Sequence, residues 1–255
     1  MSEEKIAQHT ENAFHIIGNK EKKWKEKIKE FLYEIIIIVF AVSVTLWFHN
    51  WNDRMHEKEM EKNFLIGIKN NLKTDTASLH YSIQFLKKPI AYYENVLKQI
   101  NTKTINAAYI DDNSGQLIND LYFTHDNGLF ESFKSAGNLR LIENEKLLSE
   151  ITSLYTASYP FVENHEADVF KEREEEYSKY IGAKYGMDSL WNSKIAAHIN
   201  EPEIRFHIQK YAIYLNAMND HRENLINGIV SVINSINKEL NDRFNIKDEE
   251  EKTKH

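Results

Sequence analysis

The sequence predicts an all-α protein in which one N-terminal transmembrane helix precedes a long-helix antiparallel bundle domain. Residues 35–52 carry no formal charge, in a chain that is 28% charged. Only 8 Gly and 3 Pro occur in 255 residues, so few turns are forced on the chain. Apolar residues recur at steps of three and four in two long stretches, which is typical of amphipathic helices.

Residues 1–30 form a lysine-rich head that we expect to lie in the cytosol. Lysine and arginine concentrate on the cytosolic side of a membrane span. Six lysines closely precede the uncharged run, at positions 20, 22, 23, 25, 27 and 29, against Arg54, Lys58 and Lys62 after it. The remainder of the chain is therefore predicted to lie on the opposite side of the membrane.

Residues 31–52 are expected to be the membrane span. Ten residues between Ile35 and Phe48 are Ile, Val, Leu or Phe, and each favours the bilayer centre by roughly 0.3–0.6 kcal/mol. A helix from residue 31 to residue 51 rises about 31 Å, enough for a hydrocarbon layer about 30 Å thick. We therefore predict that Glu34 lies at one membrane interface and that Trp47 and Trp51 lie near the other.

Two other interpretations of this run are open. A buried core helix of a soluble protein would be amphipathic, whereas residues 35–48 are apolar all round. A cleaved secretory signal would fit the small residues Ala41 and Ser43, but the preceding region is long and the apolar run continues beyond them. An uncleaved signal anchor is the favoured interpretation.

Composition limits the functions of the part beyond the span. Residues 1–52 hold seven Lys and seven Glu, so the net charge of -7 belongs to the rest of the chain. This acidity argues against nucleic acid or an anionic membrane surface as a partner of the domain. The chain has no Cys, which excludes disulfides, thiolate metal sites and a cysteine nucleophile.

The predicted domain, residues 53–246, begins with a long helix over residues 53–100, which Pro89 should kink or divide. Its apolar stripe comprises Phe64, Leu65, Ile68, Leu72, Leu79, Ile83, Leu86, Ile90, Tyr93, Leu97 and Ile100. Residues 101–127 are expected to be a loop with a short helix around residues 116–123. A short helix over residues 128–136 should end at Gly137, which tolerates left-handed backbone.

Asn144 is a predicted N-cap of a helix to about Ser158, and Pro160 should open a charged helix to about Tyr180. The last helix should run from Pro202 to near Arg243. Its stripe comprises Ile204, Ile208, Tyr211, Leu215, Met218, Leu225, Ile229, Ile233, Ile236 and Leu240. The first and last helices are expected to frame the bundle, and residues 247–255 to be a disordered tail.

The spacing of reactive residues favours no catalytic, cofactor or metal site. The sequence has no His-Glu-x-x-His pair, no Glu-x-x-His pair and no Gly-x-Ser-x-Gly, and its glycines are scattered. We expect the tyrosines of the domain to be core and rim residues. No catalytic residue, cofactor-binding residue or metal ligand is therefore predicted.

Three segments have a recognisable pattern: residues 34–39, the Leu-Trp-Phe-His-Asn-Trp-Asn-Asp exit at residues 46–53, and residues 130–142, which a helix at residues 147–155 follows. In these segments the sequence resembles DUF6090, a bacterial family of small single-pass membrane proteins of unknown activity. With the predicted orientation, such a protein would lie in the bacterial inner membrane and its domain would be periplasmic. The resemblance implies membrane location and a shared central motif. Candidate interaction residues in that motif are Phe130, Phe133, Ser135, Gly137, Asn138 and Arg140. The motif could equally be wholly structural.

Three functions are compatible with these observations. The leading hypothesis is a membrane-anchored helical module for protein interaction or scaffolding, with a protein partner or a second copy of the chain. The alternative is a ligand-sensing bundle that signals through the single span and needs a pocket with convergent polar groups. An enzyme of unknown class is the third, and would need carboxylates and histidines clustered in a cleft.

Overall fold

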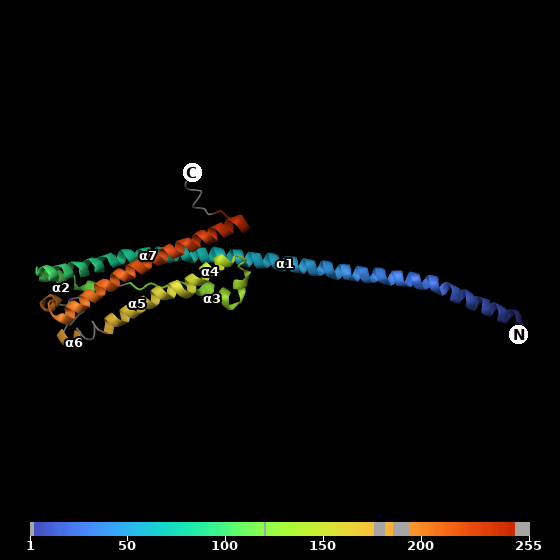
Figure 1. Ribbon diagram of the computed structural model, residues 1–255, viewed down its shortest axis with the longest axis horizontal. Helices are drawn as coiled ribbons and strands as arrows, with labels where there is room; N and C mark the ends of the chain where they lie inside the picture. Colours follow the sequence, from blue (N-terminus) through green and yellow to red (C-terminus); the bar gives the residue numbers. More distant parts are fainter. Residues whose placement is uncertain (1–2, 120, 176–181, 186–193, 248–255) are drawn as a thin grey trace. The chain divides into compact units, whose positions relative to one another are not determined.

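The computed structural model describes residues 3–119, 121–175, 182–185 and 194–247. It divides into two compact units, Met1–Glu59 and Met60–His255. Every regular element in the described ranges is a helix and none is a strand, so the predicted all-α class is confirmed. The elements are α1 (Glu3–Thr102), α2 (Ala107–Asp112), η1 (Ser114–Leu117), α3 (Gly128–Ser135), η2 (Asn138–Leu141), α4 (Glu145–Ser153), η3 (Leu154–Ser158), α5 (Tyr159–Arg173), α6 (Gly182–Tyr185), η5 (Ile195–His198) and α7 (Pro202–Phe244), labelled where room allows in Figure 1.

The first unit contains the candidate membrane helix. From Phe31 to Phe48 every side chain is exposed except that of Val44, which is half-buried. This part of α1 is long and apolar enough to cross a membrane, with a mean hydropathy of 2.3 over 18 residues. The predicted apolar helix near the N-terminus is therefore present, and its apolar side chains lie on all sides of the helix axis.

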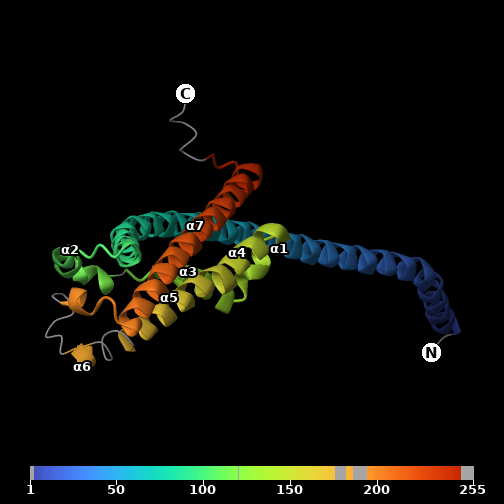
Figure 2. The same ribbon diagram turned by 60° about the vertical axis from the view of Figure 1, so that its left-hand side comes forward.

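In the second unit, the part of α1 after Met60 buries one face. Most of the predicted stripe from Phe64 to Ile100 is buried, and Ile90 and Leu97 are half-buried at its edge. Pro89 does not divide the helix, because α1 continues to Thr102. Figure 2 shows that α1 changes direction in its last, blue-green part, as expected for a helix that contains a proline.

The predicted helix at residues 116–123 is wrong. Helical structure occurs earlier, in α2 and η1, and residues 121–127 form an extended segment without regular structure. The backbone N–H groups of Phe123 and His125 are hydrogen-bonded to side chains of α5 rather than to carbonyl groups of their own segment. These distant acceptors replace the local bonds that a helix would need.

The boundaries around α3 and α4 agree with the sequence pattern. Gly137 follows α3 with φ 72, the left-handed conformation predicted for it. The Asn144 side chain accepts a hydrogen bond from the Leu147 N–H at 3.1 Å, so it is the N-cap of α4. A single π-helical turn, η3, joins α4 to α5, where the sequence predicted a boundary between two helices. The end of the charged helix predicted at Tyr180 lies outside the described residues.

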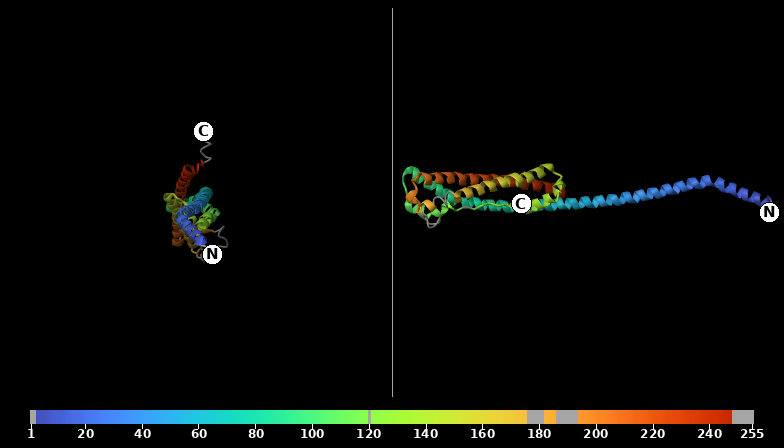
Figure 3. Two further views of the ribbon diagram at one scale, coloured as in Figure 1. Left: turned by 90° about the vertical axis from the view of Figure 1, so that its right-hand side faces the viewer. Right: turned by 90° about the horizontal axis from the view of Figure 1, so that it is seen from below.

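The core of the second unit consists of two clusters of buried apolar residues. The first cluster is Phe64, Leu65, Ile68, Leu72, Leu79, Ile83, Phe123, Phe130, Phe133, Leu141, Ile142, Leu147, Ile151, Leu154, Tyr155, Tyr159, Val162, Leu225, Ile226, Ile229, Val232, Ile236 and Leu240. The second cluster is Leu86, Tyr92, Tyr93, Val96, Ile100, Ile110, Leu117, Val169, Ile195, Ala196, Ile199, Ile204, Ile208, Tyr211, Ala212, Leu215 and Met218. Helices α1, α5 and α7 contribute to both clusters, and Figure 3 shows α4, α5 and α7 extending along the blue-green part of α1.

Candidate functional site

A buried ion pair lies between the two core clusters. Arg222 of α7 donates from Nε to Glu166 Oε1 at 2.7 Å and from Nη2 to Glu166 Oε2 at 2.9 Å. The Arg222 side chain is 0% exposed and the Glu166 side chain 1%. Along α7, Arg222 falls between Met218 of the second cluster and Leu225 of the first. The pair therefore replaces apolar contacts at the level where the two clusters meet.

The same pair holds the extended segment 121–127. Arg222 donates to the Leu121 carbonyl, and Glu166 Oε2 accepts from the Phe123 N–H at 3.0 Å. One turn earlier on α5, Glu163 Oε1 accepts from both the N–H and the ring Nδ1 of His125, each at 2.8 Å. Two carboxylates of one helix thus bind alternate backbone N–H groups of the segment, and this arrangement, the carboxylate clamp, fixes its path.

Asp75 is a second buried acid, on α1. Tyr159 donates a hydrogen bond to Asp75 Oδ2 at 2.6 Å, and the His125 ring stacks on Tyr159 with centroids 4.0 Å apart. Burial raises the pKa of the Asp75 carboxyl, and the hydrogen bond from Tyr159 opposes this shift. Burial and the bond to Asp75 both raise the pKa of the Tyr159 hydroxyl. These groups resist ionisation and tie α1 to α5.

A charge network connects α1 with the last turn of α7. Arg243 Nη1 donates to Glu61 Oε1 at 2.7 Å and to Glu239 Oε1 at 2.9 Å, and its Nη2 lies 2.9 Å from Glu143 Oε2. Burial raises the pKa of Glu61, although Arg243 lowers it in part. The Asn144 amide donates to Glu239 Oε2 at 2.6 Å, which joins the N-cap of α4 to the network.

None of these buried charges is predicted from the sequence, although the apolar stripes contain a signal for them. Asp75 stands between Leu72 and Leu79 of the α1 stripe, and Arg222 stands within the α7 stripe. A charged residue at a core position is rarely buried unless it is paired. Charges that interrupt a stripe were therefore candidates for buried pairs, but their partners could not be assigned by spacing.

The central motif separates into buried and exposed residues. Phe130 and Phe133 belong to the first cluster, where Phe133 stacks on Phe64 with centroids 3.9 Å apart and Phe130 stacks on Tyr155 at 4.5 Å. These two aromatic residues are core residues and offer no surface for docking. The other motif residues lie at or near the surface: Ser135, Gly137 and Arg140 are exposed, and Asn138 is half-buried.

The predicted interface residues lie on the exposed apolar helix of the first unit. Glu34 is exposed, Trp47 is 62% exposed and Trp51 is 54% exposed. Trp47 and the adjacent Phe48 make an edge contact at 5.0 Å between ring centroids. These residues belong to the first unit, and the central motif belongs to the second.

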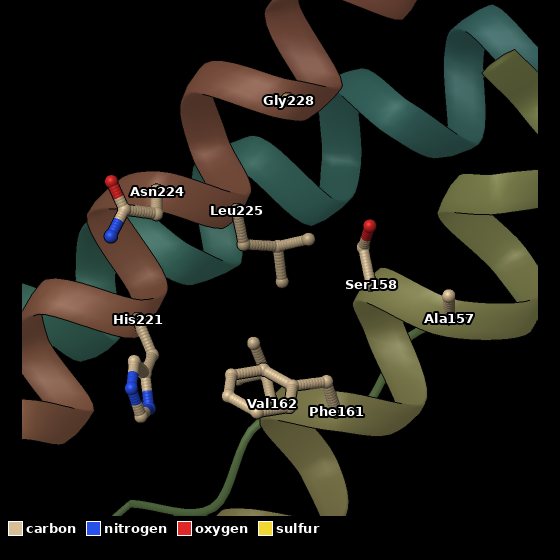
Figure 4. Close-up of a pocket in the computed structure, with 8 residues that line it drawn as sticks. All are labelled: Ala157, Ser158, Phe161, Val162, His221, Asn224, Leu225 and Gly228. Carbon is tan, nitrogen blue, oxygen red and sulfur yellow. The ribbon is translucent and has the colours of Figure 1, made fainter.

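An apolar groove of about 510 Å³ lies between η3–α5 and α7 in the second unit. Its lining is Ala157, Ser158, Phe161, Val162, His221, Asn224, Leu225 and Gly228, drawn in Figure 4. Phe161 is 59% exposed at its edge, and a Cβ added at Gly228 would meet no atom within 4 Å. The π-helical turn forms part of one wall, and such turns are frequent at functional sites.

A pair of histidines lies at one end of this groove. The rings of His221 and His165 meet edge to face with centroids 4.8 Å apart. Burial and the neighbouring His165 lower the pKa of His221, so its neutral form is favoured near pH 7. The groove therefore combines an apolar wall with neutral polar groups, namely this imidazole, the Ser158 hydroxyl and the Asn224 amide.

Comparisons of the chain with protein-family models, with curated proteins and with solved structures find no match. Among the described residues, no group of three or more His, Asp or Glu side chains is placed to hold a metal ion. Two features of the described residues therefore need a functional interpretation. The first is an apolar helix with exposed side chains, and the second is a helical domain with buried charge pairs and an apolar groove.

Proposed function

We propose that the chain is a single-pass membrane protein whose helical domain serves protein interaction or scaffolding. The observation that carries this proposal is the all-round exposure of apolar side chains from Phe31 to Phe48. Water would disfavour that surface by roughly 25 cal/mol per Å² of apolar area. A bilayer covers such a helix on all sides at once, whereas one docked protein would cover only one face.

The orientation with the N-terminus in the cytosol is supported by the lysines before the span. With this orientation in the bacterial inner membrane, the second unit lies in the periplasm. The resemblance to the DUF6090 family is part of the same proposal, since it implies membrane location and no particular reaction.

The helical domain is best described as an antiparallel bundle. Arg243, near the end of α7, contacts Glu61 of α1, while Arg205, near the start of α7, donates to Asn101 near the end of α1. These contacts support opposite directions for the two long helices. The buried charges of the domain bind one another and the backbone, which favours a scaffold over a catalytic site.

Single cysteines test the topology, since the chain has no native Cys. Ser2→Cys and Ser78→Cys variants, the latter at an exposed position of α1, would be treated in intact cells with a membrane-impermeant maleimide. We expect labelling at position 78 and none at position 2 until the cells are lysed. The opposite result would reverse the topology, and recovery of the full-length protein in the cytosolic fraction would refute the membrane span.

An interaction role is tested at the exposed part of the central motif. In vivo photocrosslinking from Ser135 and from Arg140 should give one defined adduct, either with another protein or with a second copy. The same crosslinker at Ser78, equally exposed but outside the motif, is the matched control. If the two motif positions give no adduct beyond that control, the motif is structural.

The groove specifically favours the ligand-sensing alternative. A volume of about 510 Å³ falls within the range of about 300–1,000 Å³ usual for small-molecule sites. Gly228→Leu would place a side chain in the groove at a position where a Cβ meets no atom within 4 Å, and Asn227→Leu, beside it but outside the lining, is its control. The fluorescent dye anilinonaphthalene sulfonate binds apolar surface through its aromatic rings, and its binding should fall only in the first variant. Equal binding in both variants would show that the groove is not a binding site for such a molecule.

A further inference from the structure

An apolar stripe lies on α1 immediately before the predicted span. Trp24, Ile28 and Phe31 are four and three residues apart, so they share one side of the helix. Their side chains are 68%, 38% and 61% exposed. Tryptophan is enriched where membrane meets water, so the stripe is a candidate contact with the headgroup layer.

The depth of these residues follows from helix geometry. At 1.5 Å per residue, Ile28 lies about 4.5 Å and Trp24 about 10 Å before Phe31 along the axis. The polar layer on each side of the hydrocarbon is about 5–8 Å thick. If Phe31 begins the span, residues 24–30 lie in or directly beside the headgroups. This step rests on the proposed span but not on its orientation.

Charge surrounds the stripe in a regular pattern. From Lys20 to Lys29 the chain has six Lys and two Glu, a net charge of 6 − 2 = +4, in a protein whose total is -7. By helical spacing of 100° per residue, positions 20, 23 and 27 fall on one side of the stripe, position 25 falls on the other side, and positions 22 and 29 lie toward the opposite face of the helix. Lysines that border an apolar stripe allow it to enter the interface while the ammonium groups reach phosphate.

The same pattern disfavours a second copy as the occupant. If two copies packed their stripes together in parallel, position 20 of one helix would face position 25 of the other. Both positions are lysine, so like charges would meet across the pair. An anionic surface is complementary to every one of these lysines.

We propose that residues 20–31 bind the anionic phospholipid headgroups of the leaflet that the helix enters. The ligand class is the phosphodiester of a lipid with net negative charge. Each lysine close to such a surface strengthens binding by about fivefold at low salt. We call this segment, residues 20–31, the collar. It selects anionic lipids in addition to determining the orientation of the span.

The test uses the full-length protein in nanodiscs of phosphatidylcholine, alone or mixed with phosphatidylglycerol. Spin-labelled lipids report the preference of the protein surface for phosphatidylglycerol over phosphatidylcholine. The variant K22Q/K25Q/K29Q removes three charges from the collar. The control K87Q/K88Q/K98Q removes three charges from exposed positions of α1 in the helical domain.

We expect the native chain and the control to prefer phosphatidylglycerol several-fold, and the collar variant to lose at least half of that preference. Added salt should reduce the preference for phosphatidylglycerol in the native chain and in the control, because it screens the attraction between lysine and phosphate. No preference in the native chain, or an equal loss in both variants, would overturn the proposal. Efficient disulfide crosslinking of a Trp24→Cys variant in the same nanodiscs would assign the stripe to a second copy instead. Failure to enter either nanodisc would count against the span itself and not against lipid selection.

Discussion

Two stretches of α1 deal with apolar surface in opposite ways. In residues 31–48 the apolar side chains surround the helix and are exposed, whereas in residues 60–102 they occupy one face and are buried. The second stretch contains charges within its buried face, at Glu61 and Asp75, and each is hydrogen-bonded to another helix. The first contains only Glu34, near its end. The hydrocarbon interior of a bilayer offers no partner for a charge, while a protein core can supply one.

The largest effect is expected where a buried charge loses its partner. Arg222→Met should lower the free energy of unfolding by about 3–5 kcal/mol, because the Glu166 side chain is left buried without its charged partner. The measurement is urea unfolding of the full-length protein in detergent, followed by near-ultraviolet circular dichroism.

Two further variants make this result specific. R222M/E166Q should recover most of the loss, since a neutral amide can still accept from the Phe123 N–H. Arg205→Met, at an exposed position, should cost less than about 1 kcal/mol. If Arg222→Met were as mild as Arg205→Met, the ion pair would be dispensable.

A charge introduced into residues 31–48 should impair insertion of the helix into the membrane and leave folding of the helical domain unaffected. Ile38→Arg replaces a favourable residue by one that costs about 2.5–3.5 kcal/mol at the bilayer centre, a total change of about 3–4 kcal/mol. The fraction of protein in carbonate-washed membranes should fall sharply. Ile213→Arg, at a position 67% exposed in the helical domain, should not change it. Equal membrane retention of both variants would contradict a span at this position.

Truncation of an apolar side chain should also have different effects on stability in the two stretches of α1. Leu72→Ala creates a cavity at a fully buried position of the first cluster and should cost about 2–5 kcal/mol in unfolding. Ile37→Ala, at a position 65% exposed in the first stretch, should leave the unfolding of the helical domain unchanged. Similar losses in both variants would mean that residues 31–48 also pack against protein.

The smallest predicted effect concerns pH. The folded state raises the pKa of Asp75 from its ordinary value of 3.8, mainly through burial. The folded state therefore binds a proton more readily than the unfolded state, and stability from this group falls as pH rises from about 4 through the raised pKa. Asp75→Asn should lack this loss, so its stability relative to the native chain should increase between about pH 4 and 7.

Urea midpoints across that pH interval measure the difference. Asp168→Asn, an exposed carboxylate of α5, is the control and should parallel the native chain. A pH profile of Asp75→Asn that also parallels the native chain would show that the Asp75 carboxyl does not titrate in the predicted sense.

The sequence predicted those features that depend on near neighbours in the chain. Helix α7 follows from Pro202 and its apolar stripe, the turn at Gly137 from its tolerance of positive φ, and the start of α4 from the Asn144 cap. Each is determined within a few residues. The apolar helix of the first unit is similarly local, because its composition alone identifies it.

The features that sequence reasoning missed depend on distant partners. The extended segment binds acceptors 38 and 43 residues away, Arg222 and Glu166 are 56 residues apart, and Arg243 and Glu61 are 182 apart. No periodicity encodes such a pairing. The sequence could not tell which residues of the central motif are buried. Its aromatic residues belong to the core, and an interaction role for its exposed residues stays a prediction.

The carboxylate clamp has a consequence for sequence variation. Glu163 and Glu166 grip the main chain of the extended segment at Phe123 and His125, and every residue type except proline supplies the amide hydrogen that they require. Exposed positions of this segment, such as Thr124, should therefore accept many substitutions. Proline at position 123 or 125 would remove a hydrogen-bond donor and should disrupt the fold.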